Sequence, residues 1–176
     1  MVKNIKKQIR NQRGLTLIEL LAVVVILGII AAIAIPSIGG IIENTKKDAH
    51  IANAQQIANA ARLYVTTEKK TIDTTGITIG LNELIAKGHI ESIKDPSGAS
   101  NANYAEGTVN GTTYTANKTR VHVVKINNKI QYQVTLVAAN NSGTTYINGI
   151  DASNLVRENV YLNGVPAEPA KEEGVE

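Results

Sequence analysis

The chain has 176 residues, with 18 lysines and arginines against 15 aspartates and glutamates, and no cysteine. The lack of cysteine excludes the disulfides that often stabilise small extracellular domains. Five of the basic residues and none of the acids lie in the first 13 positions. They are Lys3, Lys6, Lys7, Arg10 and Arg13. The remainder carries 13 basic and 15 acidic side chains, so its charge does not indicate a nucleic-acid surface.

An apolar run of 21 residues, Leu15 to Ile35, follows this basic segment. At ~1.5 Å per residue a helix of this length matches the ~30 Å hydrocarbon core of a bilayer. Positive charge before the run and few bases after it until Lys46 predict a cytoplasmic N-terminus and an exported C-terminal part. The chain is therefore expected to be a single-pass, N-in and C-out precursor in the cytoplasmic membrane.

The apolar run contains one carboxylate, Glu19. A secretory signal peptide would place its small-residue cleavage site after the apolar region, whereas here Gly14 precedes it. An ordinary signal anchor gives no reason for an acid one turn inside, where an ionised side chain costs ~2.5–3.5 kcal/mol. Both alternatives leave Glu19 unexplained.

The string Arg13-Gly14-Leu15-Thr16-Leu17-Ile18-Glu19-Leu20-Leu21, followed by Gly28 and Pro36, resembles the class III signal of type IV pilins and pseudopilins. The resemblance covers residues 13 to about 40 and departs from the usual family pattern at Leu15, where phenylalanine is common. It implies prepilin cleavage after Gly14 and N-methylation of Leu15. It also implies that Glu19, Gly28 and Pro36 serve filament assembly.

The resemblance further implies partners and a location. These are a homopolymer with itself and minor pilins, a prepilin peptidase that is also the methylase, and an inner-membrane assembly platform with its ATPase. The subunit would leave the cytoplasmic membrane for an extracellular pilus. The absence of cysteine favours the Gram-positive type or a head stabilised by packing alone, since many Gram-negative relatives close their C-terminal region with a disulfide.

Cleavage at Gly14-Leu15 would create an α-amine with a pKa near ~8, protonated at neutral pH. In a low-dielectric setting such an amine attracts a carboxylate strongly, although desolvation offsets much of the gain. The sequence therefore leads to the hypothesis that Glu19 of one subunit pairs with the Leu15 amine of a neighbour, so that only processed subunits assemble.

Beyond the membrane run, Pro36 and Gly39-Gly40 predict a helix break near residues 36–40. From Ile41 to about Thr67 the spacing of apolar residues is helical, with two stripes. One stripe is expected to pack on the head and the alanine-rich one on neighbouring helices. The alternative is a helix that is buried only in its own globular domain. The first stripe is Ile38, Ile42, Thr45, Ala49 and Ala52, and the second is Ile51, Ala54, Ala58, Ala61 and Val65.

The head is predicted to contain a short helix at 81–88, a turn at Asp95-Pro96, and a hairpin of strands at 121–126 and 130–136. Strands near 111–116 and 144–148 are expected to extend the hairpin to a sheet of three or four strands, with a helical turn capped by Asp151 after it.

These elements predict an α+β fold of the type IV pilin kind: a long N-terminal α-helix packed on a small antiparallel β-sheet head. The expected division is a cleaved leader at 1–14, a transmembrane and filament-core helix at 15–36, its amphipathic continuation at 37–70, a globular head at 71–165 and a disordered acidic tail at 166–176.

No catalytic residue, cofactor or metal site is predicted. His50, His89 and His122 fall in different expected elements with no metal-ligand spacing, and no phosphate-binding or nucleophile-elbow motif occurs. The favoured function is a structural pilus subunit (a fimbrial protein) for adhesion, twitching motility or DNA uptake. The alternatives are a major pseudopilin of a type II secretion or competence system and, more distantly, a monomeric membrane-tethered binding domain.

Overall fold

The structure, a computed structural model, describes residues 16–98, 102–107, 109–110, 113–114, 118–139 and 144–164. It divides into two compact units, Met1–Ile42 and Glu43–Glu176. The expected leader with its five charges, the cleavage site Gly14-Leu15 and the acidic tail at 166–176 all lie outside the described residues.

The longest element is helix α2, Leu17–Thr67, which has 51 residues. It ends where the sequence predicted, but it is unbroken through Pro36, Gly39 and Gly40, so the expected break at 36–40 is wrong. A proline removes one backbone hydrogen bond, and that loss is local. Long helical segments on both sides have already met the cost of nucleation, so the helix propagates through this weak point.

Within the first unit, the side chains of α2 are apolar on every face. Every leucine, isoleucine and valine from Leu17 to Ile42 is at least 48% exposed. The best 18-residue window of α2 has a mean hydropathy of 3.0 and none of it is buried, so the helix is long and apolar enough to cross a membrane. A helix that is hydrophobic all round requires lipid or other helices as its surroundings.

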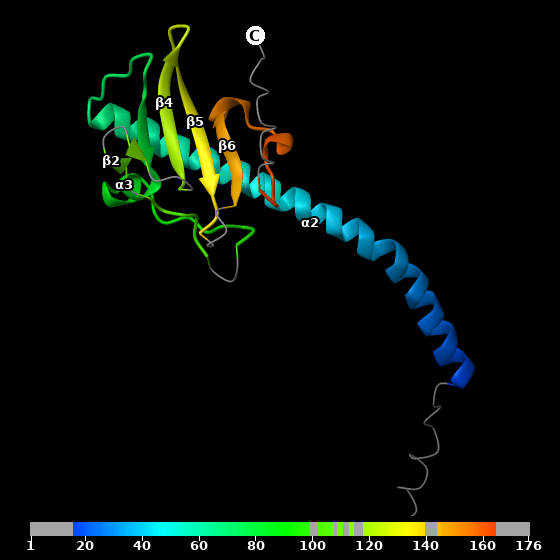
Figure 1. The fold of residues 1–176 in the computed structure, drawn as a ribbon. Helices are drawn as coiled ribbons and strands as arrows, with labels where there is room; N and C mark the ends of the chain where they lie inside the picture. The colour runs from blue at the N-terminus through cyan, green and yellow to red at the C-terminus, as the bar shows by residue number, and fades with distance from the viewer. Residues whose placement is uncertain are drawn as a thin grey trace, which may run out of the picture. The chain divides into compact units, whose positions relative to one another are not determined.

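The second unit contains a four-stranded antiparallel sheet in the order β1-β4-β5-β6 (Figure 1). The strands are β1 Ile77–Gly80, β4 Arg120–Ile126, β5 Lys129–Val137 and β6 Thr145–Asp151. The predicted hairpin is β4–β5, and its two-residue turn is Asn127-Asn128, both at positive φ (49° and 63°). Asparagine tolerates this left-handed conformation, which the tight hairpin turn requires.

Two details of the observed sheet differ from the prediction. Thr113 and Tyr114, the described part of the strand expected near 111–116, do not extend it, because β3 (Thr113–Tyr114) pairs with β2 (Val109–Asn110) in a separate two-stranded sheet. The edge strand is instead β1, which has only four residues and was too short to identify by alternation. Helix α3, Leu81–Ala86, follows β1 directly and is followed by Gly88 at φ +73°, the predicted glycine stop.

After β6 the chain forms two short 3-10 turns, η2 (Ala152–Asn154) and η3 (Arg157–Asn159). The carboxylate of Asp151 accepts a hydrogen bond from the N–H of Ser153 at 3.0 Å, which confirms the predicted cap. Together these elements confirm the predicted α+β fold, a long N-terminal helix packed on a small antiparallel sheet.

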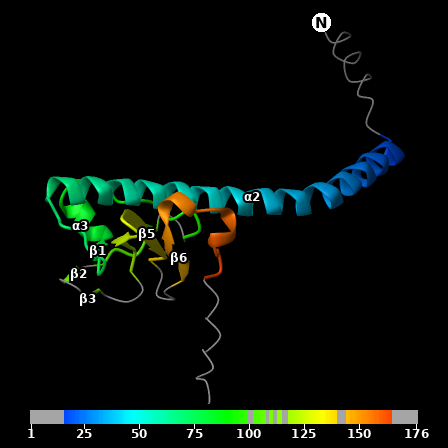
Figure 2. The same cartoon turned by 90° about the horizontal axis from the view of Figure 1, so that it is seen from above.

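The core lies between the sheet and the part of α2 that belongs to the second unit (Figure 2). Ala54, Ala58 and Ala61 are buried there against strands that contribute Val121, Val123, Val134, Leu136 and Ile147. The expectation that the alanine-rich stripe meets neighbouring helices is therefore wrong. Small side chains bring α2 close to its own sheet, and the other stripe, including Ala52, stays at the surface.

Replacing Ala61 by leucine should test which stripe carries the sheet. Ala61 is fully buried, so Ala61→Leu should lower the free energy of unfolding by ~1–3 kcal/mol through overpacking. Ala52→Leu, at an exposed position of the same helix, should change it by less than ~0.5 kcal/mol. Urea unfolding followed by tyrosine circular dichroism measures both, and equal losses in the two variants would contradict this packing.

Candidate functional site

The first described residues place Thr16 at the N-cap of α2 and Glu19 in its first turn. The N–H of Thr16 donates to Glu19 Oε2 at 2.8 Å, and the N–H of Glu19 donates to Thr16 Oγ1 at 3.3 Å. The Thr16 hydroxyl also donates to Glu19 Oε2 at 2.8 Å. This reciprocal arrangement is a capping box, in which a threonine and a glutamate three residues later bond each other's backbone N–H.

The capping box gives the one acid of the apolar run a structural role in its own chain. It draws the carboxylate back to the start of α2, where backbone N–H groups lack helical partners and the helix dipole favours negative charge. The Thr-x-x-Glu spacing in the sequence is typical of this arrangement. Thr16 therefore belongs to this candidate site, and the sequence prediction missed it although its signal was present.

The other predicted assembly residues, Gly28 and Pro36, lie further along α2 and do not meet Glu19. No atom lies within 4 Å of the position that a Cβ on Gly28 would occupy. Packing within the described part of this chain thus gives no reason for a glycine at 28.

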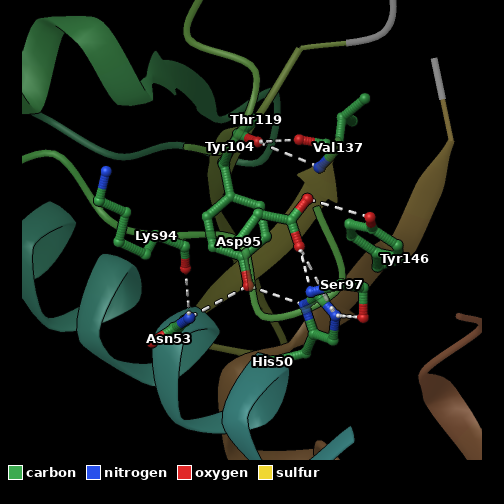
Figure 3. Close-up of polar contacts among 9 residues, drawn as sticks. All are labelled: His50, Asn53, Lys94, Asp95, Ser97, Tyr104, Thr119, Val137 and Tyr146. Atoms are coloured by element: carbon green, nitrogen blue, oxygen red, sulfur yellow. Dashed lines mark hydrogen bonds and ion pairs between the residues drawn. The ribbon is translucent and has the colours of Figure 1, made fainter. Parts of the chain in front are cut away.

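The second unit contains a buried polar cluster that links α2 to the loop after α3 and to β6 (Figure 3). Its centre is His50 on α2, which is fully buried. His50 Nδ1 lies 2.7 Å from the hydroxyl of Tyr104, and Nε2 lies 2.9 Å from Oγ of Ser97. Asn53 donates from Nδ2 to the same tyrosine oxygen at 3.1 Å.

One tautomer of His50 satisfies all of these contacts. With Asn53 donating to the Tyr104 oxygen, the Tyr104 hydroxyl can donate to His50 Nδ1, and in that tautomer Nε2–H donates to Ser97 Oγ. Burial lowers the pKa of His50 to about 4, so the ring is neutral at neutral pH. Its 4.0 Å approach to Asp95 is then not an ion pair under those conditions.

This arrangement does not resemble a catalytic triad despite its serine, histidine and aspartate. In a triad the serine and the aspartate bond opposite nitrogens of the ring, whereas here Ser97 and Asp95 both face Nε2, and Nδ1 faces Tyr104. Asp95 does not orient the ring either, because its oxygens accept from the Ser97 N–H at 2.8 Å and the Tyr146 hydroxyl at 3.0 Å. The cluster instead links α2 to the loop after α3 and to β6.

A second link joins α2 to the C-terminal turns. Arg157 in η3 donates from Nε and Nη2 to the two carboxylate oxygens of Asp48, each at 2.6 Å. The two residues are 109 positions apart and about half exposed. Bidentate pairs have well-defined geometry even at a surface. This pair, together with buried Leu155 and Val160, fastens the end of the described head to α2 without a covalent bond.

The three histidines that the sequence analysis considered as metal ligands lie in three different environments. His50 is in the buried cluster, His122 on β4 shares a hydrogen bond with Thr78 Oγ1, and His89 packs edge-on against the ring of Tyr64. Among the residues that the structure describes, no group of three histidine, cysteine, aspartate or glutamate side chains could hold a metal ion.

The low pKa of His50 predicts a loss of stability in acid. The unfolded chain binds a proton at His50 as the pH falls below about 6.5, whereas the folded head resists until about 4. The unfolded state therefore binds more protons in that window, and folding should weaken by up to ~3 kcal/mol between these pH values. Above pH 6.5 the His50 ring is neutral in both the folded and the unfolded state, so its titration no longer changes the free energy of unfolding.

Urea unfolding of the full chain in non-ionic detergent at several pH values measures the effect. The variant His50→Gln keeps an amide in the cluster but cannot titrate, so its stability should fall less between pH 6.5 and pH 4. His89→Gln, at a partly exposed histidine, is the matched control and should keep the wild-type slope. The same slope in His50→Gln and the wild type would show that His50 does not carry the effect.

Comparison with known proteins identifies the N-terminal motif. A family profile described as the prokaryotic N-terminal methylation motif matches residues 9–35. No curated protein and no solved structure matches the chain significantly. The matched motif implies a prepilin peptidase substrate that assembles into a filament. The chain thus carries the class III signal peptide of type IV pilins and pseudopilins, as the residues around Gly14 and Glu19 predicted.

Proposed function

We propose that the protein is the structural subunit of a type IV pilus. It is cut after Gly14, N-methylated at Leu15 and polymerised into an extracellular filament through the apolar part of α2. The observation that carries this proposal is the methylation motif at residues 9–35, whose part from Leu17 onward lies on a helix with every large apolar side chain up to Ile42 exposed. Such a surface needs lipid before assembly and other helices after it.

The capping box supports a role for Glu19 in this assembly. Its carboxylate is held at the very start of α2 by Thr16, the residue next to Leu15 in the chain. Cleavage converts the amide nitrogen of Leu15 into an amine with a pKa near ~8, which is a cation at neutral pH. The processed subunit therefore carries both charges at one helix end, and a neighbour offset along the filament pairs its amine with Glu19.

Gly28 supports close packing between subunits. A glycine without neighbours in its own chain leaves a notch in a helix that is otherwise lined by bulky side chains. Small residues let apolar helices approach closely, which strengthens their dispersion contacts. Pro36 adds a point without a backbone donor, where the helix loosens when subunits pack. In this proposal Glu19 sets the register, and Gly28 and Pro36 shape the contact.

Two substitutions at Glu19 separate charge pairing from helix capping. Glu19→Ala removes both the charge and the cap, whereas Glu19→Gln removes the charge and keeps a side chain that completes a capping box. Both variants should be processed normally, and both should yield few or no filaments in sheared fractions. Glu43→Ala removes an exposed acid from the same helix and should assemble as the wild type does. Normal filaments from Glu19→Gln would refute the charge pairing.

The cleavage site has a separate test. Gly14→Arg replaces the small residue that the peptidase requires, so the full-length precursor should accumulate in the membrane fraction. Immunoblotting against the head resolves the precursor from the product that lacks 14 residues. Mature-length protein in this variant would overturn the assignment of the cut between Gly14 and Leu15.

Electron microscopy of the same sheared material distinguishes the filament types. A surface pilus predicts long fibres that label with antibody against the head. Short fibres that stay within the envelope would instead assign the chain to a secretion or competence pseudopilus. Protein found only as a membrane-bound monomer would contradict the filament proposal altogether.

A further inference from the structure

The β4–β5 hairpin extends beyond the rest of its sheet. Strand β1 pairs with β4 only as far as Val123, and β6 pairs with β5 only from Gln133 onward. Between these points β4 and β5 pair only with each other, as far as Ile126 and Lys129. Residues 124–132, the hairpin tip, therefore project from the sheet, and Figure 1 shows the turn beyond the end of β6.

The hairpin tip exposes apolar side chains beside positive charges. In the described part of the second unit, the large apolar side chains that are exposed are Leu63, Ile126, Ile130, Val156 and Tyr161. The two isoleucines of this set lie at the tip and are 38% and 48% exposed. Ile126 is the direct cross-strand partner of Lys129, so both side chains project from one face, with Cβ atoms about 4.5–5.5 Å apart. The tip also contains Lys125 and has no acid.

A third exposed apolar side chain, Leu63, lies in a groove between α2 and the segment that follows α3. The groove, here called the α2 groove, has a volume of about 390 Å³. Leu63 is 51% exposed in it. One acid, Glu91, lines the groove, and the lining includes no lysine or arginine. The lining residues are Gln56, Asn59, Ala60, Leu63, His89, Ile90 and Glu91.

The hairpin tip and the α2 groove are complementary in shape and charge. The tip is a projection with an exposed isoleucine beside a lysine, and the groove is a hollow with an exposed leucine and a glutamate. None of the ion pairs between described residues uses Glu91 or Lys129. Apolar contact at the centre with opposite charges at the rim is the usual composition of a protein–protein interface.

The occupant that fits both surfaces is a second copy of this chain. A contact between the tip of one copy and the groove of the next joins two different surfaces, and such heterologous contacts generate an open helical filament when they do not close into a ring. We propose that the hairpin tip of one subunit docks into the α2 groove of the next, with Ile126 against Leu63 and Lys129 near Glu91. This docking rests on the polymerisation proposed above, and it adds a specific contact between heads.

Charge reversal tests the docking in cells that make the full chain. Glu91→Lys and Lys129→Glu each place like charges together, so each should lower the yield of sheared fibres by about tenfold. The double variant restores opposite charges and should recover most of the wild-type yield. Immunoblotting of the sheared fraction measures it. Normal fibre yield from both single variants, or a double variant no better than either one, would contradict the docking.

Glu158→Lys is the matched control, because it reverses an exposed acid of the head outside the α2 groove. It should assemble as the wild type does, and it should not rescue Lys129→Glu. Rescue by Glu158→Lys as complete as rescue by Glu91→Lys would show that net charge, rather than docking, sets the yield.

Crosslinking tests the proximity of the two surfaces. The chain has no cysteine, so an introduced thiol is the only one in each subunit. Fibres from cells that express Lys129→Cys and Glu91→Cys together should give covalent dimers with a short bismaleimide, whereas fibres of either variant alone should not. Glu158→Cys in place of Glu91→Cys should give far fewer dimers. No dimers from the mixed fibres, or equal numbers from the control mixture, would contradict the docking.

These outcomes separate the docking from the filament proposal. Wild-type fibres that form without the tip-to-groove contact would overturn the docking alone. Wild-type chain that never forms fibres would overturn both.

Discussion

One carboxylate in the otherwise apolar part of α2, from Leu17 to Ile42, is the constraint on which the rest of this account depends. An acid in such surroundings must be given hydrogen-bond donors, and the chain supplies two from Thr16 to Glu19 Oε2. This local solution places the charge at the end of α2 rather than part-way along it. Because the proposed cut lies directly before Leu15, the residue next to Thr16, the geometry of the cap and the proposed cleavage concern neighbouring atoms.

The second unit solves a different problem, which is to hold a helix against a sheet without cysteine. Close packing of alanines provides the apolar part of the contact. The His50 cluster and the pair between Asp48 and Arg157 add directional bonds at the N-terminal side of this contact. Buried polar networks are stable only when each member has a partner, so the cluster also restricts how α2 can slide along the sheet. Noncovalent contacts thus hold α2 on the sheet in place of a disulfide.

The sequence predicted features that depend on local patterns and missed those that depend on distant pairs. The apolar run, the end of α2 at Thr67, the hairpin turn at Asn127-Asn128 and the cap at Asp151 all have local signals. Nothing local links His50 to Tyr104, which is 54 residues away, or reveals the four-residue strand β1. The prediction of a break at Pro36 was wrong because it counted the costs of single residues and left out the cooperativity of the helix. The wrong choice of stripe arose because alanine permits close approach to a sheet as well as to another helix.

The central claim is that assembled subunits are processed ones, with the α-amine of Leu15 near the carboxylate of Glu19. Mass spectrometry of subunits from purified sheared fibres measures this most directly, because it reads the first residue and its modification together. The account predicts a chain that begins at Leu15 and carries one added methyl group on its nitrogen. Fibres built from subunits that still begin at Met1 would contradict it.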